Sequence, residues 1–295
     1  MQIWITGCSG FLGKRLAVIF KQSGHNVLGL SRRISSTVDV PVTIDLAADA
    51  ASEKLQDTLD NYGCPDVLVH TASQQPGQHS YSEYVKNNVL CTSSLLDSFG
   101  QRIPKLIIYT STHSVYGMPE TNPVAESHPI RGNTLYALTK RCSEQILEDF
   151  QNRAQVVIFR LPSMYGMGQV GGFIDGLAEM AVNNETIELF SKGESVRDVL
   201  YVNDVVEAIL ACAKCPPASS FSIMNLGCGR KIITQEYAET LIGALGSNSK
   251  IVPIDRPSQF NFYADVEEAK RQIGFSPTPL LESMNIYANE LKKAC

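Results

Sequence analysis

Short apolar runs that alternate with helical patterns constrain the fold of this chain more than any other feature. The predicted strands are 3–5, 27–30, 42–44, 67–69, 106–109 and 156–159, and the helices between them include 11–20, 51–59 and 135–150. Continuous apolar strands between helices are typical of a parallel sheet that is covered on both faces. The sequence therefore predicts a doubly wound α/β fold, in which ligands bind at the carboxyl ends of the strands.

After about residue 160 the alternating pattern becomes looser. Glycine, proline and serine concentrate at 162–172, and the elements that follow are shorter. We predict helices at 173–182, 205–212, 235–245 and 280–291, and strands at 187–190 and 221–225. This organisation predicts a Rossmann domain over residues 1–161, to which 204–226 contribute, and a smaller α+β substrate-binding region over 162–295.

The charge balance and the cysteines exclude several classes of protein. With 25 Lys and Arg against 30 Asp and Glu, the net charge is −5 and no basic stripe suggests nucleic acid. No run approaches the roughly 18 apolar residues of a membrane span, and the first residues do not resemble a signal peptide. We therefore expect a cytoplasmic protein without membrane or nucleic-acid partners. Cys212 and Cys215, the one close pair, lack companions at zinc spacing, so we predict buried packing and no metal site.

Residues 6–13, which join the first strand to the first helix, have the spacing of a phosphate-binding loop. Gly7 allows the tight turn, Gly10 lets the backbone approach a pyrophosphate, and Gly13 lets the helix pack near the sheet. The helix N-terminus presents unpaired N–H groups and a partial positive charge to the phosphates. The position of the loop therefore predicts a dinucleotide site, with a glycine-rich turn that binds no ligand as the alternative.

The residues after the second strand predict which dinucleotide binds. NAD-binding sites usually have an acidic residue here, which accepts a hydrogen bond from the ribose 2′-hydroxyl. This chain has Ser31, Arg32 and Arg33 instead, and guanidinium groups match phosphate oxygens. We therefore predict NADP as the cofactor, with NAD as the alternative. A third possibility is that Arg32 and Arg33 form a solvated basic turn that binds no cofactor. Asp45, after the third strand, is either an acceptor for the adenine amino group or a surface residue.

Tyr136 and Lys140 lie four residues apart, on one face of a predicted helix. A phenol has a pKa of about 10 and is a poor acid–base group at neutral pH. A nearby ammonium group favours the phenolate, so Tyr136 can exchange a proton with a carbonyl or alcohol oxygen. Ser111 and Thr112, at the end of the fifth strand, are candidates for the second hydrogen bond to that oxygen. Alone, the pair could equally be an exposed Tyr–Lys contact.

With these motifs in this order, the sequence resembles the extended short-chain dehydrogenases/reductases, also called the NAD-dependent epimerase/dehydratase family. The resemblance runs over nearly the whole chain. Its motifs are residues 6–13, 70–73, Asn88 with Thr92, 110–117, Tyr136 with Lys140, 160–166, 197–206 and 225–227.

The resemblance implies roles for residues at matching positions. Thr112 is the catalytic hydroxyl, Tyr136 is the acid–base, and Lys140 binds the nicotinamide ribose and tunes Tyr136. The predicted cofactor contacts are Gly7, Ser9, Gly10, Phe11, Leu12, Gly13, Ser31, Arg32, Arg33, Asp45, Leu46, Thr71, Ala72, Ser73, Asn88, Tyr136 and Lys140. The predicted substrate contacts are Thr112, His113, Ser163, Arg197 and Arg256. By the resemblance, Arg197 and Arg256 reach nucleotide phosphates, with structural salt bridges as the alternative. The resemblance also implies a homodimer interface formed by the helices that bear Asn88 and Tyr136.

Three departures from the family pattern limit what can be transferred. Ser163 stands where the family usually has Asn, and Cys91 replaces a common Gly. Members that eliminate water carry Asp-Glu after the catalytic Thr, but this chain has His113 and Ser114 there. Without these carboxylates, dehydration lacks its proton donor and base, so we disfavour it.

The sequence predicts an NADP-dependent reductase of a keto group, above all that of a nucleotide-linked 4-keto-6-deoxy sugar. The alternatives are a nucleotide-sugar epimerase that works by transient oxidation, a reductase of a non-sugar carbonyl, and a non-catalytic dinucleotide sensor. The same residues serve reductase and epimerase, so the preference for reduction depends on Arg32 and Arg33.

Overall fold

The computed structural model describes residues 1–258 and 260–294. Contacts divide the chain into two compact units. The first unit comprises Met1–Gly117, Ile130–Arg160 and Val206–Met224, and the second comprises Met118–Pro129, Leu161–Val205 and Asn225–Cys295.

The segment 118–129 belongs to the second unit, whereas sequence reasoning placed it in the first domain. Val124 forms a parallel bridge with Ala264, and its backbone N–H donates to the carbonyl of Tyr263 over 3.0 Å. The side-chain amide of Asn225 also donates to the carbonyl of Val124 over 2.9 Å. Long-range backbone pairing, which no local pattern shows, therefore fixes this segment in the second unit.

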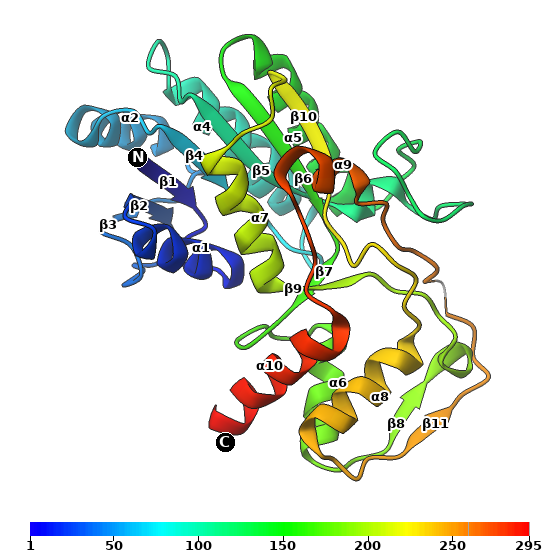
Figure 1. Ribbon diagram of the computed structural model, residues 1–295. Coiled ribbons are helices and arrows are strands. Elements are labelled where there is room, and N and C mark those ends of the chain that lie inside the picture. Colours follow the sequence, from blue (N-terminus) through cyan, green and yellow to red (C-terminus); the bar gives the residue numbers. More distant parts are fainter. Residues whose placement is uncertain (259, 295) are drawn as a thin grey trace. The chain divides into compact units, whose positions relative to one another are not determined.

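Among the described residues, seven strands form the central sheet (Figure 1). They are β1 (Gln2–Thr6), β2 (Asn26–Ser31), β3 (Val40–Thr43), β4 (Val67–His70), β5 (Leu106–Thr112), β6 (Gln155–Leu161) and β10 (Phe221–Asn225), in the order β10-β6-β5-β4-β1-β2-β3. β1 pairs in parallel with β2 and β4, and these pair in parallel with β3 and β5. The predicted doubly wound sheet is confirmed, and its order reverses at β1, where such folds bind ligands.

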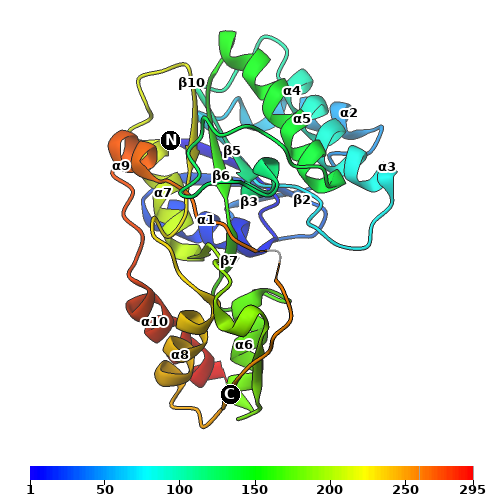
Figure 2. The ribbon, with the colours of Figure 1, turned by 90° about the vertical axis from the view of Figure 1, so that its right-hand side faces the viewer.

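Helices cover both faces of this sheet, as Figures 1 and 2 show. One face carries α2 (Ala51–Tyr62), α4 (Cys91–Ser98) and α5 (Leu135–Asp149), while α1 (Phe11–Gln22) and the end of α7 (Val202–Lys214) lie on the other. The core beneath the first set includes Trp4, Leu55, Phe99 and Leu147, all nearly inaccessible to water. Strands that are buried on both faces explain why their sequences read as continuous apolar runs.

Apolar periodicity did not predict the stretch from α3 (Tyr81–Tyr84) through η1 (Val85–Leu90) into α4, although the resemblance implied a helix that bears Asn88. Ser80 and Glu83 form a capping box at its start, which is a local signal that sequence reasoning missed. Farther along, Asn88 and Thr92 are polar residues on the buried side, so the stretch lacks a clean apolar periodicity.

The second unit contains two small parallel strand pairs and several helices. β7 (Ser163–Tyr165) pairs with β9 (Val199–Tyr201), and β8 (Ile187–Leu189) pairs with β11 (Ile251–Pro253). Its helices are α6 (Phe173–Val182), η4 (Phe190–Gly193), α8 (Thr234–Leu245), α9 (Glu267–Ile273) and α10 (Leu280–Ala294). The first unit also contains the short helices η2 (His113–Tyr116) and η3 (Phe150–Asn152). Tyr165 donates to Ser283 over 2.6 Å and so ties β7 to α10.

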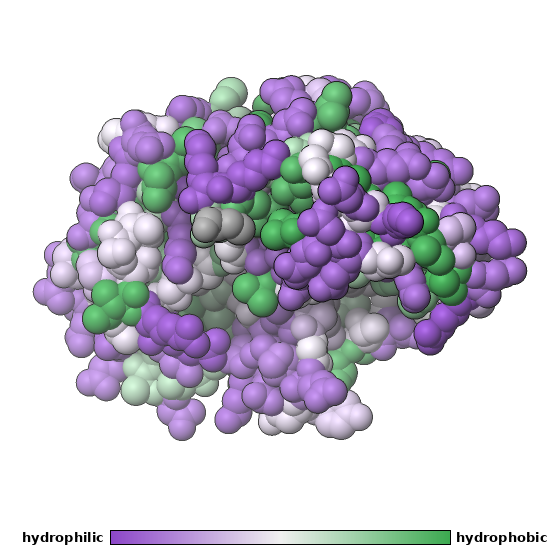
Figure 3. Space-filling view, turned by 90° about the horizontal axis from the view of Figure 1, so that it is seen from below, coloured by the Kyte–Doolittle hydropathy of each residue, from purple (hydrophilic) through white to green (hydrophobic). Residues whose placement is uncertain are grey.

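On the face shown in Figure 3, hydrophobic residues form small groups among hydrophilic ones. None of the described helices is long and apolar enough to span a membrane. The helices predicted to form a dimer expose Tyr81, Val85, Leu90 and Leu138, but the dimer itself stays a prediction.

The predicted packing of the close cysteine pair is half correct. Cys212 is buried, but Cys215 is exposed because it follows the last turn of α7. Within the described ranges, no three His, Cys, Asp or Glu residues lie close enough to hold a metal ion.

The close approach of Gly227 to Asp198 gives a test of the second unit. A Cβ at position 227 would lie 2.3 Å from Asp198 Oδ2, whereas a Cβ at Gly243 in α8 would meet nothing within 4 Å. We expect Gly227→Ala to lower the free energy of unfolding by roughly 1–3 kcal/mol. The control Gly243→Ala should raise it by about 0.5–1 kcal/mol, because alanine favours the helix. Denaturant titration measures both, and equal effects would contradict this account of the packing.

Candidate active site

The glycine loop between β1 and α1 has the geometry of a phosphate cradle. Gly7 has a φ of +69°, and its N–H donates to the carbonyl of Leu30 over 2.8 Å. A Cβ at Gly13 would lie 2.2 Å from the carbonyl oxygen of Gly7, so only glycine fits there. Gly10 caps α1 without a side-chain hydrogen bond, which leaves the first N–H groups of the helix for an anion. These residues therefore fit the phosphates of a dinucleotide.

A buried hydrogen-bond network holds the end of β4 against this loop. Thr6 Oγ1 accepts hydrogen bonds from the N–H groups of Thr71 and Ala72, over 3.1 and 3.0 Å. With both lone pairs occupied, Thr6 must donate its proton to His70 Nδ1, 2.7 Å away. The other ring nitrogen, Nε2, then carries the imidazole proton and donates to Thr92 Oγ1 over 3.0 Å. The network therefore assigns a neutral imidazole to His70.

The surroundings of His70 also disfavour its charged form. Burial, and secondarily the Lys140 ammonium, lower the pKa of His70 to about 3. In the sequence, His70 stands out only as part of the motif at 70–73, and no role was predicted for it. The structure shows that its ring connects β1, β4 and α4 beside the predicted cofactor contacts Thr71 and Ala72.

The residues predicted to contact the adenosine part lie at the ends of β2 and β3. Arg32 and Arg33 are exposed directly after Ser31, whose hydroxyl donates to the carbonyl of Arg33 over 2.5 Å. Asp45 is exposed and accepts a hydrogen bond from the N–H of Ala47 over 3.1 Å. Leu46 is buried in the core next to it. The side chains of Arg32 and Arg33 are thus accessible to a ligand from solvent.

Asn88, a predicted cofactor contact, is engaged by the protein itself. Its Oδ1 accepts from the N–H of Gln74 over 2.7 Å, and its Nδ2 donates to Thr139 Oγ1 over 2.9 Å. It is 1% exposed. Asn88 therefore positions the loop after β4 against α5, and its contact with a cofactor stays a prediction.

Thr112, Tyr136 and Lys140 come together where β5 ends beside α5. The Thr112 hydroxyl shares a hydrogen bond with Tyr136, and it also accepts from the N–H of Ser114 over 3.1 Å. Thr134 caps α5 through the N–H of Ala137 and so fixes the helix start that carries Tyr136. Lys140 Nζ donates to the carbonyl of Thr110 over 2.6 Å. The predicted catalytic trio thus lies on adjoining elements of the first unit.

The predicted lowering of the Tyr136 pKa is not found in this structure. Burial raises the pKa of Tyr136 to about 12, although the hydrogen bond with Thr112 opposes the rise. Burial also lowers the pKa of Lys140 to about 7, against the opposing effects of Glu144 and Cys91. The physical reason is desolvation, which disfavours the charged form of each group more than its neighbours stabilise it.

The predicted substrate residues are distributed over both units. His113 is buried in the first unit, while Ser163, Arg197 and Arg256 belong to the second. The Arg197 guanidinium lies 3.6 Å from the ring centroid of Phe260 and 4.6 Å from that of Phe173. Ser163 and Arg256 are exposed, and their roles stay predictions.

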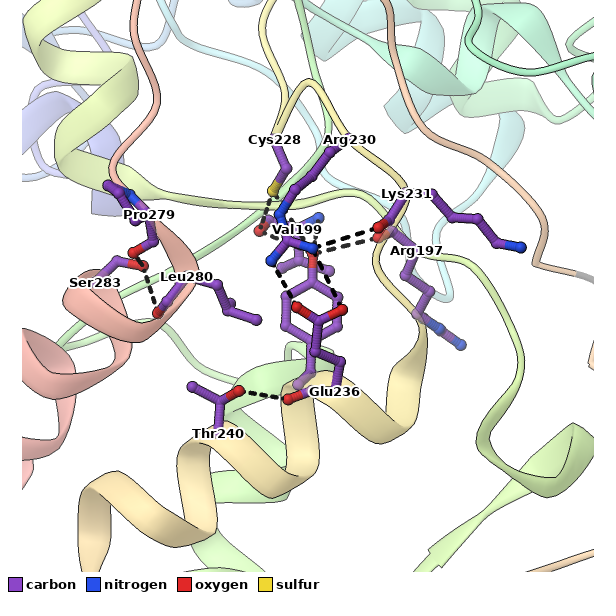
Figure 4. A network of polar contacts seen from close by, with 11 residues as sticks. Arg197, Val199, Cys228, Arg230, Lys231, Glu236, Thr240, Pro279, Leu280 and Ser283 are labelled. Atoms are coloured by element: carbon purple, nitrogen blue, oxygen red, sulfur yellow. Dashed lines mark hydrogen bonds and ion pairs between the residues drawn. The ribbon is translucent and has the colours of Figure 1, made fainter.

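Arg197 differs from its neighbour Arg230 in its partners. Arg230 forms a bidentate ion pair with Glu236, whereas no hydrogen bond or ion pair joins the Arg197 guanidinium to the other residues drawn in Figure 4. Within the described part of the chain, Arg197 Nε is buried without a hydrogen-bond partner. The alternative of a structural salt bridge is therefore not supported for Arg197.

Residues 3–227 match the model of the NAD dependent epimerase/dehydratase family. The chain belongs to this family. It is an enzyme of the extended short-chain dehydrogenase/reductase kind, as the order of its motifs predicted.

Known members of the family match the enzyme over almost its whole length. It is 26% identical to UDP-glucose 4-epimerase of Bacillus subtilis, and the match covers 96% of this chain and 94% of that protein. It is 25% identical to MoeE5 in complex with UDP-glucose and NAD, with a TM-score of 0.84 over 100% and 99% of the two chains. The UDP-glucose 4-epimerase of Thermotoga maritima, at 22% identity and a TM-score of 0.86 over 100% and 99%, shares the fold.

The neutral state of His70 predicts a dependence of stability on pH. Its pKa is about 3 in the folded protein and 6.5 in the absence of perturbation, so the unfolded chain binds the proton more readily. The contribution of the neutral His70 to the free energy of unfolding is therefore complete above about pH 6.5. Below that pH it falls by about 1.4 kcal/mol for each pH unit. We expect His70→Gln to flatten this slope, since glutamine offers a donor and an acceptor without titrating. Denaturant titrations between pH 7 and pH 5 measure it, with the exposed His79→Gln as control, and an unchanged slope in His70→Gln contradicts the assignment.

Proposed function

We propose that this enzyme is a nucleotide-sugar epimerase, which inverts a sugar carbon by transient oxidation of its hydroxyl. The observation that carries the proposal is the Thr112–Tyr136 hydroxyl pair beside the buried Lys140. The relatives that match most of the chain include UDP-glucose 4-epimerases, which supports the epimerase alternative over the ketoreductase that the sequence suggested first.

Tyr136 is the group that takes up and returns the substrate proton in this proposal. As the phenolate, Tyr136 accepts the proton of the sugar hydroxyl during oxidation, and as the phenol it donates that proton to the ketone oxygen during reduction. Thr112 holds the same oxygen with a second hydrogen bond, and the Lys140 ammonium stabilises the phenolate. Because the proton returns to the oxygen and the hydride to the carbon, the overall reaction consumes no proton and no net reductant.

The glycine loop and the ends of β2 to β4 would hold a nicotinamide dinucleotide. When bound, this cofactor would supply a reversible hydride acceptor beside the substrate carbon. The uncapped start of α1 would bind the pyrophosphate, and Thr71 and Ala72 would border it through the Thr6 network.

Arg197 supports a nucleotide diphosphate as the anionic part of the substrate. Burial lowers the pKa of its guanidinium, and two aromatic rings rather than a carboxylate surround it. Such a guanidinium gains most from an anion that reaches it, because phosphate oxygens match its donors. The UDP-glucose named with MoeE5 belongs to this class of compound.

The proposal predicts that Tyr136→Phe lowers epimerisation of UDP-glucose or a related UDP-sugar by roughly 10²–10⁴-fold, because the proton carrier is lost. Chromatography of the two epimers measures it, and Tyr81→Phe, at an exposed tyrosine of the same unit, is the control. Wild-type enzyme should form the epimer without net oxidation or reduction of cofactor. Full activity of Tyr136→Phe would overturn the assignment and favour a differently organised site.

An NADPH-dependent reductase remains the second candidate, and Arg32 and Arg33 favour it. They are exposed at the end of β2, where NAD-binding sites usually have an acid. The cofactor named with MoeE5 is NAD, however, so the relatives do not support a preference for NADP.

Binding measurements with both cofactors separate these possibilities. If the arginines hold a 2′-phosphate, Arg32→Ala and Arg33→Ala should each weaken NADPH binding by roughly tenfold and leave NADH binding unchanged. Lys54→Ala, at an exposed lysine of α2, controls for the loss of one positive charge. Equal effects on both cofactors, or none, would remove the basis for NADP.

A further inference from the structure

Glu144 is a fully buried carboxylate one helical turn beyond Lys140 on α5. It is 0% exposed, yet each of its oxygens has two hydrogen-bond donors. Oε1 accepts from Ser111 Oγ over 2.5 Å and from Arg160 Nε over 3.0 Å. Oε2 accepts from Arg160 Nη2 and from Arg141 Nη1, both over 2.8 Å. A buried carboxylate with four donors stays charged.

The charge of Glu144 is kept although burial opposes it. Burial alone would raise the pKa of Glu144, but Arg160, Ser111 and Arg141 together hold it below its usual value. Arg160 comes from β6 and is 2% exposed, and its Nη1 donates to the Tyr116 hydroxyl over 3.0 Å. The carboxylate therefore joins α5, β5 and β6 through charged hydrogen bonds.

The partners of Glu144 lie next to the predicted catalytic groups. Ser111 stands between Thr110, whose carbonyl receives the Lys140 hydrogen bond, and Thr112, which bonds to Tyr136. Lys140 and Glu144 are four residues apart on the same face of α5. One carboxylate thus adjoins both the strand end and the helix face that form the site.

Few other groups can compensate the buried Lys140 ammonium. The ring of Tyr109 on β5 lies 4.1 Å from Nζ, and the thiol of Cys91 on α4 also favours the charged lysine. His70 on β4 faces Lys140 as a neutral ring, and Tyr136 on α5 is a neutral phenol. Among these neighbours, Glu144 is the group that is fixed as an anion.

We propose that Glu144 is a positioning residue for this reaction, which stabilises the Lys140 ammonium against desolvation and holds the Ser111–Thr112 strand end at Tyr136. The inference depends on the roles proposed above for Tyr136 and Lys140. Without an anion on α5, desolvation would leave Lys140 neutral in neutral solution. A neutral lysine could not stabilise the Tyr136 phenolate, and proton transfer from the sugar hydroxyl would slow.

A purely structural Glu144–Arg160 pair is the competing explanation. Breaking a buried pair leaves an uncompensated charge and destabilises the fold, whatever its effect on Lys140. The experiment therefore needs a readout that stability alone does not change. The protonation of Lys140 itself is such a readout, and it requires neither substrate nor cofactor.

The test is a carbon-13 NMR titration of the lysine Cε signals, in which Lys140 is identified by the signal lost in Lys140→Arg. We expect Glu144→Gln to lower the pKa of Lys140 by about one unit or more, as removal of a neighbouring opposite charge does. Glu148→Gln, the same change one turn farther along α5, should leave it unchanged. An equal pKa of Lys140 in wild type and Glu144→Gln overturns the proposal.

A second variant covers the case in which Glu144→Gln does not fold. Glu144→Gln combined with Arg160→Met removes both charges of the buried pair, and such replacements are often tolerated. A lowered pKa of Lys140 in this variant supports the proposal, and an unchanged one overturns it.

Activity then separates this inference from the proposed function. In Glu144→Gln, kcat at neutral pH should fall roughly tenfold, and the alkaline limb of the kcat profile should move to lower pH. If Tyr136→Phe is fully active, the catalytic role proposed for Tyr136 fails, whatever the titration shows. If Tyr136→Phe is inactive and Glu144→Gln behaves like Glu148→Gln in the titration, only the role of Glu144 is lost.

Discussion

Burial of the Lys140 ammonium between β5 and α5 is the constraint on which the rest of the site depends. A cation that is 1% exposed must find its compensation within the protein. It donates to the Thr110 carbonyl, lies on the Tyr109 ring and shares a helix face with Glu144. The same burial raises the pKa of Tyr136 and lowers that of Lys140, so the phenolate that the proposed reaction requires depends on the groups that favour the ammonium.

The strands of the sheet could be predicted because strands that are buried on both faces have continuous apolar sequences. Strands such as β1 and β5 are covered on both faces, and their apolar runs have no other simple explanation. Periodicity missed the α3–η1–α4 stretch, which only the resemblance implied, because Asn88 and Thr92 interrupt its buried side with polar groups. Those groups are satisfied by Gln74, Thr139 and His70, which are distant partners that no local pattern reveals.

The candidate site was predictable where it depends on spacing. The glycine loop and the Tyr136–Lys140 pair follow from positions on one turn or one helix face, and the structure places them at the carboxyl edge of the sheet. The shift in the Tyr136 pKa was not predictable, because it follows from burial rather than from the neighbouring lysine. Glu144 was also missed, although its spacing of four residues after Lys140 was a signal. Its importance depends on Arg160 and Ser111, which only the fold brings to it.

The central claim is that a sugar hydroxyl is oxidised and reduced again within one site. It is tested most directly with UDP-glucose deuterated at C4, which is incubated with the enzyme and analysed by mass spectrometry and proton NMR. The account predicts a 4-epimer that keeps the deuterium at C4, because the hydride that leaves the carbon also returns to it. Loss of the deuterium to solvent, or a product that forms only while NADPH is consumed, would contradict the account.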